Sequence, residues 1–313
     1  MYIESIVTPK KTYNLNKGVN FISSDCPIAF TQNLKSVLNN FAYRLGHRKY
    51  AKKFNLEVKG SFTFNFDYKD SIYPLSVVND KANSRQFAKM TKSITQERET
   101  NITRQYPLFR AYLPSQLISY STSAYYSHLA HSIATSGLYC GLGVYINSID
   151  IPITEYDCCR SLISMKNYEY AEFLEDGNSL NIIDTLQEWL RAIFPDRYSC
   201  CKVDIRNHKV YIDAEEEKRN KLQAKYSDEE QYFILSLIDI LMRAFVLTEP
   251  KYRDISTITG IEGIILLYHD QEKFLGNYKT IFNDNYINLF INNIPKYFPN
   301  LQIIIQNSTN EDQ

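Results

Sequence analysis

The stretch YSDEEQYFILSLIDILMRAF, residues 226–245, joins a helix-start signal to an almost uninterrupted apolar run. Ser227 is of a residue type that favours the N-cap of a helix, and Glu230 follows three residues later, as in a capping box. Beyond this start, apolar residues occupy nearly every face of the helix, which is typical of a protein interior. The stretch therefore predicts a buried helix that begins at Ser227.

The segments that follow this helix predict a parallel part of a sheet. The sequence GIEGIILLYH, residues 260–269, contains a continuous apolar run, and LQIIIQ, residues 301–306, forms another. Between them, residues 278–298 have the periodicity of a helix. Strands that are apolar on both faces are typical of covered parallel sheets, and a strand–helix–strand order connects parallel neighbours.

The N-terminal part predicts a strand that leads into a loop and a helix. Residues 19–22 favour a strand and end at a Ser-Ser-Asp-Cys-Pro loop, and residues 31–50 place apolar side chains at helical spacing. Phosphate-binding loops are built in this order of strand, loop and helix. Residues 61–68 alternate between aromatic and polar side chains, which favours a half-buried antiparallel strand, and the polar residues 79–105 indicate an exposed insertion.

The middle of the chain is predicted to be mainly helical. Residues 155–194 have helical character, and the amphipathic sequence IIDTLQEWLRAIF within them stops before Pro195. A hairpin that turns at residues 206–208 is expected next, and a charged link then leads to the helix of residues 226–245.

The charge balance and the absence of long apolar runs limit the classes of partner. Lys and Arg total 35, as do Asp and Glu, so no overall basic field would hold nucleic acid. Direct nucleic-acid binding is left open and would need a local patch or a partner. No apolar run approaches about 18 residues and no signal-like leader begins the sequence, so we expect no membrane contact and a cytoplasmic location.

The cysteines and histidines do not have the spacing of a metal site. Two histidines, His128 and His131, lie three residues apart without an evident third ligand, so we interpret them as surface or packing residues. The cysteines lack C-x-x-C or His-paired spacing and are interpreted as buried, reduced thiols. They are Cys26, Cys140, Cys158, Cys159, Cys200 and Cys201. We therefore expect no metal and no cofactor.

Five segments carry a family resemblance through their order and spacing. They are GVNFISSDCPIAFTQNLKSVL (18–38), LPSQLISYSTS (113–123), YSDEEQYFILSLIDIL (226–241), GIILLYHDQEKFL (263–275) and YFPNLQIIIQNST (297–309). Their order resembles that of the ABC-type ATPase heads of the SMC, RecF and overcoming-lysogenization (OLD) group. It is similar in particular to the bacterial AAA-family ATPases found with restriction and phage-defence systems.

The resemblance implies an α/β fold of the P-loop-NTPase-like ABC ATPase head type. Such a head has a mainly parallel core sheet, an N-terminal antiparallel β portion and an inserted helical lobe. Residues 1–313 would form a single head. Its core lobe would comprise residues 1–110 and 248–313, and its helical or signature lobe residues 111–247.

The segment aligned with the family's phosphate-binding loop has lost the residues that hold phosphate. It runs from Ser23 to Phe30, contains neither Gly nor Lys, and has Ala29 at the position of the Lys. Asp25 adds a negative charge, Pro27 lacks a backbone N–H, and Phe30 replaces the hydroxyl that would bind magnesium. We expect this loop to repel a triphosphate.

The Walker B strand also lacks its carboxylates. Tyr268 and His269 stand where one carboxylate would hold magnesium and a second would polarise the attacking water. A register slip that recruits Asp270 or Glu272 is the alternative interpretation.

Two further nucleotide-contacting positions differ from the family. In the signature motif Ser227 is kept, but Glu229 stands at the Gly position and would place a carboxylate against phosphate oxygens. After the last strand, Ser308 stands where a His would contact the γ-phosphate.

These four changes predict a catalytically inactive ABC-type subunit, a pseudo-ATPase rather than an enzyme. It would act as a scaffold or regulator, as a homodimer or as a heteromer with an active ATPase or nuclease subunit. The resemblance alone implies bacterial antiphage defence or DNA processing as the setting. The alternatives are an ATP-binding and ATP-hydrolysing ABC-type ATPase with non-standard motifs, and an interaction protein of unrelated α/β fold.

Overall fold

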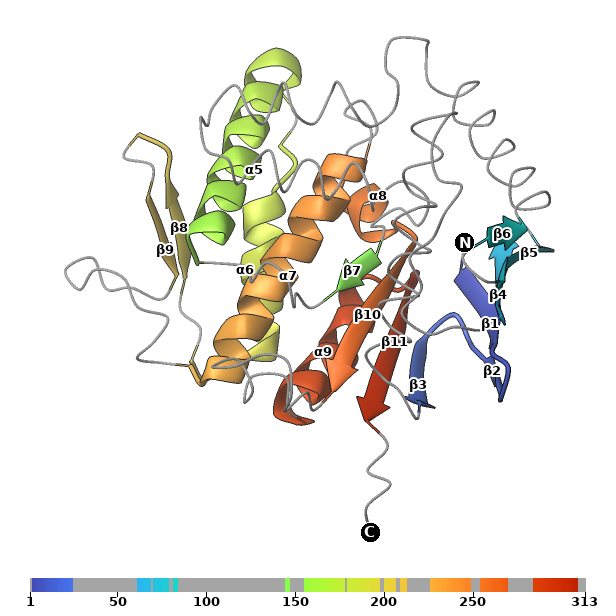
Figure 1. Ribbon diagram of the computed structural model, residues 1–313. Coiled ribbons are helices and arrows are strands. Elements are labelled where there is room, and N and C mark those ends of the chain that lie inside the picture. The colour runs from blue at the N-terminus through green and yellow to red at the C-terminus, as the bar shows by residue number, and fades with distance from the viewer. Residues whose placement is uncertain are drawn as a thin grey trace. The chain divides into compact units, whose positions relative to one another are not determined.

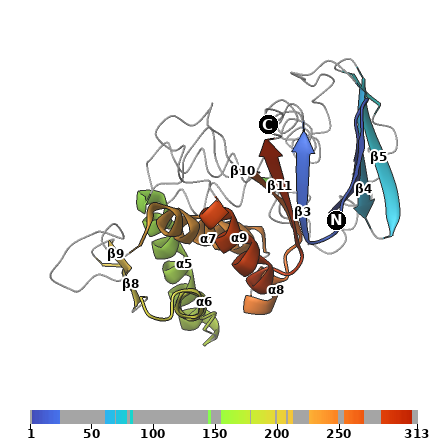
Figure 2. The same cartoon turned by 90° about the horizontal axis from the view of Figure 1, so that it is seen from below.

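The computed structural model describes residues 2–24, 61–68, 70–78, 81–83, 144–146, 155–177, 179–197, 200–206, 209–212, 226–248, 254–269 and 284–308. The fold is mixed α/β with both antiparallel and parallel sheets, which confirms the predicted class at this level (Figures 1 and 2). The chain divides into two compact units. The first comprises Met1–Ile146, Glu262–Tyr268 and Asn300–Gln313, and the second comprises Asn147–Ile261 and His269–Pro299.

The first unit contains a five-stranded antiparallel sheet in the order β2-β1-β4-β5-β6. Its strands are β1 (Tyr2–Val7), β2 (Thr12–Asn14), β4 (Ser61–Tyr68), β5 (Ser71–Val78) and β6 (Lys81–Asn83). The predicted alternation in β4 is confirmed, because Phe62, Phe64 and Phe66 are buried and the residues between them are partly exposed. Within the polar segment 79–105, residues 81–83 form β6 and pair with β5, while the rest of the segment lies outside the described residues, so the expected exposed insertion stays a prediction.

A bulge in β1 lets two isoleucines with an odd spacing face the same core. In a regular strand Ile3 and Ile6 would point to opposite faces. The register with β4 shifts between Ile3 and Ser5, so both isoleucines are fully buried while Glu4 is exposed. The Leu15 N–H donates to the Glu4 carbonyl at 2.7 Å and holds the bulge in place.

The first unit also contains a four-stranded sheet in the order β3-β11-β10-β7. Strand β3 (Val19–Ser24) is parallel to β11 (Leu301–Ser308), and β10 (Gly263–His269) is parallel to β7 (Val144–Ile146). The strands predicted from residues 19–22, 260–269 and 301–306 are therefore confirmed. Phe21 of β3 is 58% exposed. The buried apolar side chains of these strands are Ile22, Ile264, Ile265, Leu267, Leu301, Ile303, Ile304 and Ile305.

Two buried amides connect β3 and β11 to the N-terminal residues. The Gln302 amide nitrogen donates to the carbonyls of Ile3 and Asn16, both at 2.8 Å, and its oxygen accepts the Ile3 N–H at 2.9 Å. The Asn20 amide nitrogen donates to Asn16 at 2.9 Å and to Ile303 at 3.3 Å, while its oxygen accepts the Asn16 N–H at 2.7 Å. Because both amides are more than nine-tenths buried, these bonds fix the turn before β3 in a single arrangement.

The second unit is mainly helical. Its elements are α5 (Glu155–Asp176), α6 (Ile182–Ile193), the hairpin β8 (Cys201–Asp204) and β9 (Lys209–Ile212), α7 (Asp228–Leu247), α8 (Ile255–Thr259) and α9 (Asp284–Tyr297). The predicted helical region, hairpin and buried helix are all confirmed. The buried side chains of α7 are Phe233, Ile234, Ser236, Leu237, Ile238, Asp239, Ile240, Leu241, Met242, Ala244 and Phe245.

Aromatic side chains join the helices of the second unit. The Trp189 ring of α6 stacks on the Tyr297 ring of α9 with a centroid distance of 4.6 Å. The Phe233 ring of α7 meets the Phe290 ring of α9 edge to face at 6.3 Å. Helix α6 ends just before Pro195, as predicted. The apolar side chains of α6 are buried in this core.

A buried carboxylate from α5 caps the start of α6. The N-cap residue of α6, Asn181, has a positive φ of 52° and makes no side-chain cap hydrogen bond. Instead, Glu169 Oε1 accepts the Ile183 N–H at 3.1 Å, and its Oε2 accepts from Lys166 Nζ at 2.8 Å. The charge of Glu169 thus lies at the positive end of the α6 dipole.

Within the described ranges, none of the helices is both long and apolar enough to span a membrane.

Candidate functional site

The site that the structure describes in most detail is the N-terminal end of α7. Ser227 has the extended backbone of an N-cap, and its hydroxyl oxygen accepts the Glu230 N–H at 3.3 Å. In return, Glu230 Oε2 accepts the Ser227 N–H at 2.9 Å. The capping box predicted from the sequence is therefore confirmed. It engages the Ser227 hydroxyl and two backbone N–H groups at the helix start.

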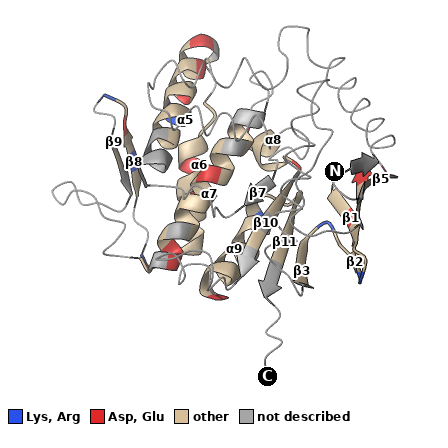
Figure 3. Ribbon diagram, in the orientation of Figure 1, with Lys and Arg blue, Asp and Glu red and all other residues tan. Residues whose placement is uncertain are grey.

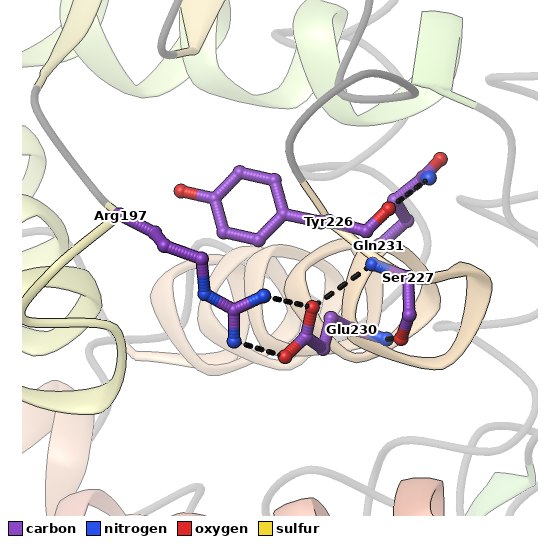
Figure 4. Close-up of polar contacts among 5 residues, drawn as sticks. All are labelled: Arg197, Tyr226, Ser227, Glu230 and Gln231. Atoms are coloured by element: carbon purple, nitrogen blue, oxygen red, sulfur yellow. Dashed lines mark hydrogen bonds and ion pairs between the residues drawn. The ribbon is translucent and has the colours of Figure 1, made fainter.

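Arg197, from the turn that follows α6, completes this arrangement. Its guanidinium donates through Nη1 to Glu230 Oε2 at 2.7 Å and through Nη2 to Glu230 Oε1 (Figure 4). This hydrogen-bonded carboxylate raises the pKa of Arg197, against a smaller opposing effect of burial. Glu230 therefore binds two cationic groups at once, the guanidinium and the positive end of the helix dipole.

Two aromatic rings hold the guanidinium in position. The guanidinium carbon lies 5.5 Å from the centre of the Phe194 ring and 5.7 Å from that of Tyr226. These rings meet each other edge to face at 5.2 Å, and the Gln231 amide donates to the Tyr226 carbonyl at 2.9 Å. The residue before α7 and the turn after α6 are thereby joined across the helix start.

Glu229 adds a second carboxylate to the first turn of α7. It is half-buried, and the resemblance described above aligns it with a signature Gly. In Figure 3 acidic residues colour this end of α7 red. The helix start therefore bears its own negative charge, which opposes the binding of another anion there.

The parallel sheet brings together two other predicted positions. In the β3–β11 register Ser23 lies opposite Asn307, and Ser24 lies opposite Ser308. The Ser23 carbonyl accepts the Tyr13 hydroxyl at 3.0 Å. Ser23 and Ser308 therefore lie near the carboxyl ends of two neighbouring parallel strands.

The remaining predicted positions divide into two groups. Tyr268 and His269 are the last residues of β10, where the structure describes their backbone. The phosphate-loop residues Asp25, Ala29 and Phe30 lie outside the described residues.

The alternative Walker B carboxylates, Asp270 and Glu272, also lie outside the described residues, as do His128 and His131. Among the residues that the structure does describe, no three His, Cys, Asp or Glu side chains gather closely enough to hold a metal ion. Cys201 is buried and reduced, and Cys200 is partly exposed and reduced.

Sequence reasoning missed Arg197. It is separated from Glu230 by 33 positions, and neither its neighbours nor its spacing indicates that it pairs with α7. The signals that could have suggested it are the apolar Phe194 just beyond α6 and the aromatic Tyr226 before the N-cap, which together favour contact between these two helix ends.

No family model matches the chain, and no curated protein matches it. Among solved structures, a crystal structure of an Smc head bound to the C-winged helix domain of ScpA is similar to 99% of this chain and 90% of that chain, with 12% sequence identity and a TM-score of 0.38. A likeness of this degree does not define a family. The described residues show a two-unit α/β protein with two antiparallel sheets and a third sheet that contains parallel strand pairs.

Proposed function

We propose that the chain is a catalytically inactive ABC-type ATPase-like subunit that acts as a scaffold or regulator in a protein assembly. The observation that carries the proposal is the occupied N-terminal end of α7. In the family that the motifs resemble, a signature Ser and the adjacent backbone N–H groups meet the γ-phosphate of a nucleotide on a partner head. Here two of these backbone N–H groups are already bonded, since the Ser227 N–H donates to Glu230 Oε2 and the Glu230 N–H donates to the Ser227 hydroxyl oxygen.

Electrostatics supports the same conclusion. A phosphate at this helix end would lie near the carboxylates of both Glu229 and Glu230. At an effective dielectric constant of about 20, two unit charges of like sign about 4 Å apart repel by roughly 4 kcal/mol. The nearby cation, Arg197, is bound to Glu230 through both carboxylate oxygens, so it is already neutralised.

The arrangement of the parallel strands β3 and β11 supports the proposed ABC-type fold. β3 and β11 end beside each other, as the resemblance implies for the strands that lead to the phosphate loop and the switch position. We propose that residues 1–313 form one head, with a core lobe of residues 1–110 and 248–313 and a helical or signature lobe of residues 111–247. The proposed setting is cytoplasmic, in bacterial antiphage defence or DNA processing. The proposed partner is a second copy or an active ATPase or nuclease subunit, and no cofactor is required.

Equilibrium dialysis of the purified full chain against labelled ATP and Mg²⁺ tests the proposal. We expect no saturable binding in the micromolar range. A Glu229→Gly variant should also fail to hydrolyse ATP, because neither the phosphate loop nor the end of β10 gains the groups that hydrolysis requires. Micromolar binding, or turnover by the variant, would refute the proposal and favour an ATP-binding ABC-type ATPase with non-standard motifs. An experimental structure with a different strand order would favour an interaction protein of unrelated α/β fold.

A further inference from the structure

The C-terminal half of α5 exposes an unusually apolar side. Tyr170, Phe173 and Leu174 are 59%, 55% and 64% exposed. Residues three and four positions apart lie on the same side of a helix, so these three side chains form one continuous strip. We call this strip, together with Glu172 and Glu175 beside it, the α5 end surface.

This strip continues the face that packs into the core in the first half of the helix. Leu162 is fully buried and precedes Phe173 by three helical turns, so the two lie on one face. Ile163 is likewise buried and has the same relation to Leu174. The C-terminal end of α5 extends past the ends of α6 and α7 (Figure 1). The apolar face therefore continues beyond the helices that cover it lower down.

The charge of the same helix end is also uncompensated. Glu172 and Glu175 lie in the last two turns of α5, and its last turn contains no basic residue. Acidic residues colour this end of α5 red in Figure 3. The helix closes through Gly177, whose φ of 70° suits glycine and whose N–H donates to the Phe173 carbonyl at 3.0 Å. The C-terminal end of a helix carries a partial negative charge, which is unfavourable next to carboxylates. A cation from another molecule would therefore stabilise this end of α5.

We propose that the α5 end surface docks an amphipathic helix of a partner protein, in which Lys or Arg side chains flank a row of aliphatic side chains. The spacing of Tyr170, Phe173 and Leu174 suits the ridges of a second helix. The flanking carboxylates suit its basic residues. A second copy of this chain is disfavoured, because two α5 ends would bring their carboxylates together. The inference does not depend on whether the chain binds nucleotide.

Two synthetic helical peptides test this proposal with the full chain. They share the same row of leucines, and they carry either lysines or glutamates at the flanking positions. Fluorescence anisotropy should show binding of the lysine peptide and at least tenfold weaker binding of the glutamate peptide. Raising the salt concentration from about 0.05 M to about 0.5 M should lower the affinity for the lysine peptide several-fold, because the Debye length shortens.

Variants of the surface provide the decisive comparison. A Phe173→Ser/Leu174→Ser variant should lose about a hundredfold in affinity, since two apolar side chains no longer enter the contact. Phe21→Ser, at an apolar side chain on β3 that is 58% exposed, is the matched control and should leave the affinity unchanged. Glu172→Lys/Glu175→Lys should reverse the preference between the peptides, and this readout holds even if the serine variant folds poorly.

Three outcomes would overturn the proposal. The first is failure of the lysine peptide to bind at millimolar concentration. The second is equal binding by the wild-type chain and the charge-reversed variant. The third is a dimer in sedimentation equilibrium that the Phe173→Ser/Leu174→Ser variant dissociates, which would assign the surface to a second copy.

Discussion

Replacing Glu230 separates the two contributions that its carboxylate makes at the start of α7. Glu230→Ala removes both the acceptor for the Ser227 N–H and the partner of Arg197. Glu230→Gln keeps an oxygen that can accept the Ser227 N–H but removes the negative charge. The two variants therefore distinguish the capping hydrogen bond from the ion pair.

The structure indicates which contribution is larger. Loss of a capping interaction costs about 0.5–2 kcal/mol. The ion pair is more modest, about 0.2–1 kcal/mol, because the Arg197 side chain is 45% exposed and the pair is screened by solvent. We expect Glu230→Ala to lower the free energy of unfolding by about 2 kcal/mol and Glu230→Gln to lower it by less than about 1 kcal/mol.

Urea unfolding followed by tryptophan fluorescence measures this difference. Trp189 is the single tryptophan of the chain and is buried in the second unit, so its emission reports on the unit that contains α7. With a slope of about 2 kcal/mol per molar urea, the Ala variant should unfold at a midpoint lower by about 1 M.

Glu188→Ala, at an exposed position of α6, is the control and should shift the midpoint little. Equal losses in the Ala and Gln variants would show that the charge, and not the cap, dominates. No loss in the Ala variant would refute the description of the site.

Three other substitutions test the packing. Ser236→Ala should cost about 1–3 kcal/mol in urea unfolding, because it removes the buried 3.0 Å bond to the Tyr286 hydroxyl, and adding Tyr286→Phe should recover part of the loss. Gln302→Leu should lower the melting temperature measured by circular dichroism, because it leaves buried backbone groups unpaired. Burial raises the pKa of Tyr297 above its ordinary value, so folding opposes ionisation of this phenol, and stability is lost as the pH rises through the pKa of Tyr297; Tyr297→Phe should reduce the alkaline loss of stability measured by Trp189 fluorescence.

The parts of the fold that the sequence predicted correctly are those set by local pattern. The capping box of Ser227 and Glu230 lies within one helical turn, so its two residue types suffice to identify it. The alternation in β4 follows from the two-residue repeat of a strand. Continuous apolar runs likewise identified β10 and β11, because parallel strands are covered on both faces.

The features that sequence reasoning missed depend on contacts between distant residues or on very short elements. Arg197 pairs with α7 across 33 positions, and Glu169 caps α6 from another helix. β7 and α8 span three and five residues, too few for a periodic pattern. For α8 a local signal was present, since Asp254 accepts the Thr257 N–H in the manner of an N-cap.

The candidate site was predictable only in part for a related reason. Ser227 lies at the start of a helix, as its capping box predicts, whereas Ser23, which was expected in the loop after the strand, still belongs to β3. That Arg197 pairs with Glu230 at this helix end depends on how two distant segments pack, which spacing alone does not determine. The loss of nucleotide chemistry at Asp25, Ala29, Phe30 and the end of β10 stays a prediction that the ATP-binding experiment tests.

The pairing of β3 with β11 has a consequence for how the protein emerges from the ribosome. Strand β3 ends at Ser24 and its partner begins at Leu301, so these two strands cannot pair until synthesis has passed residue 301. At about 5–20 residues per second, synthesis of the intervening segment takes on the order of tens of seconds. The bond that Asn20 donates to the Ile303 carbonyl and the bond that Gln302 donates to the Asn16 carbonyl form only at that stage. Strand β1 can pair with β2 and β4 early in translation, whereas β3 remains without its β11 partner until then.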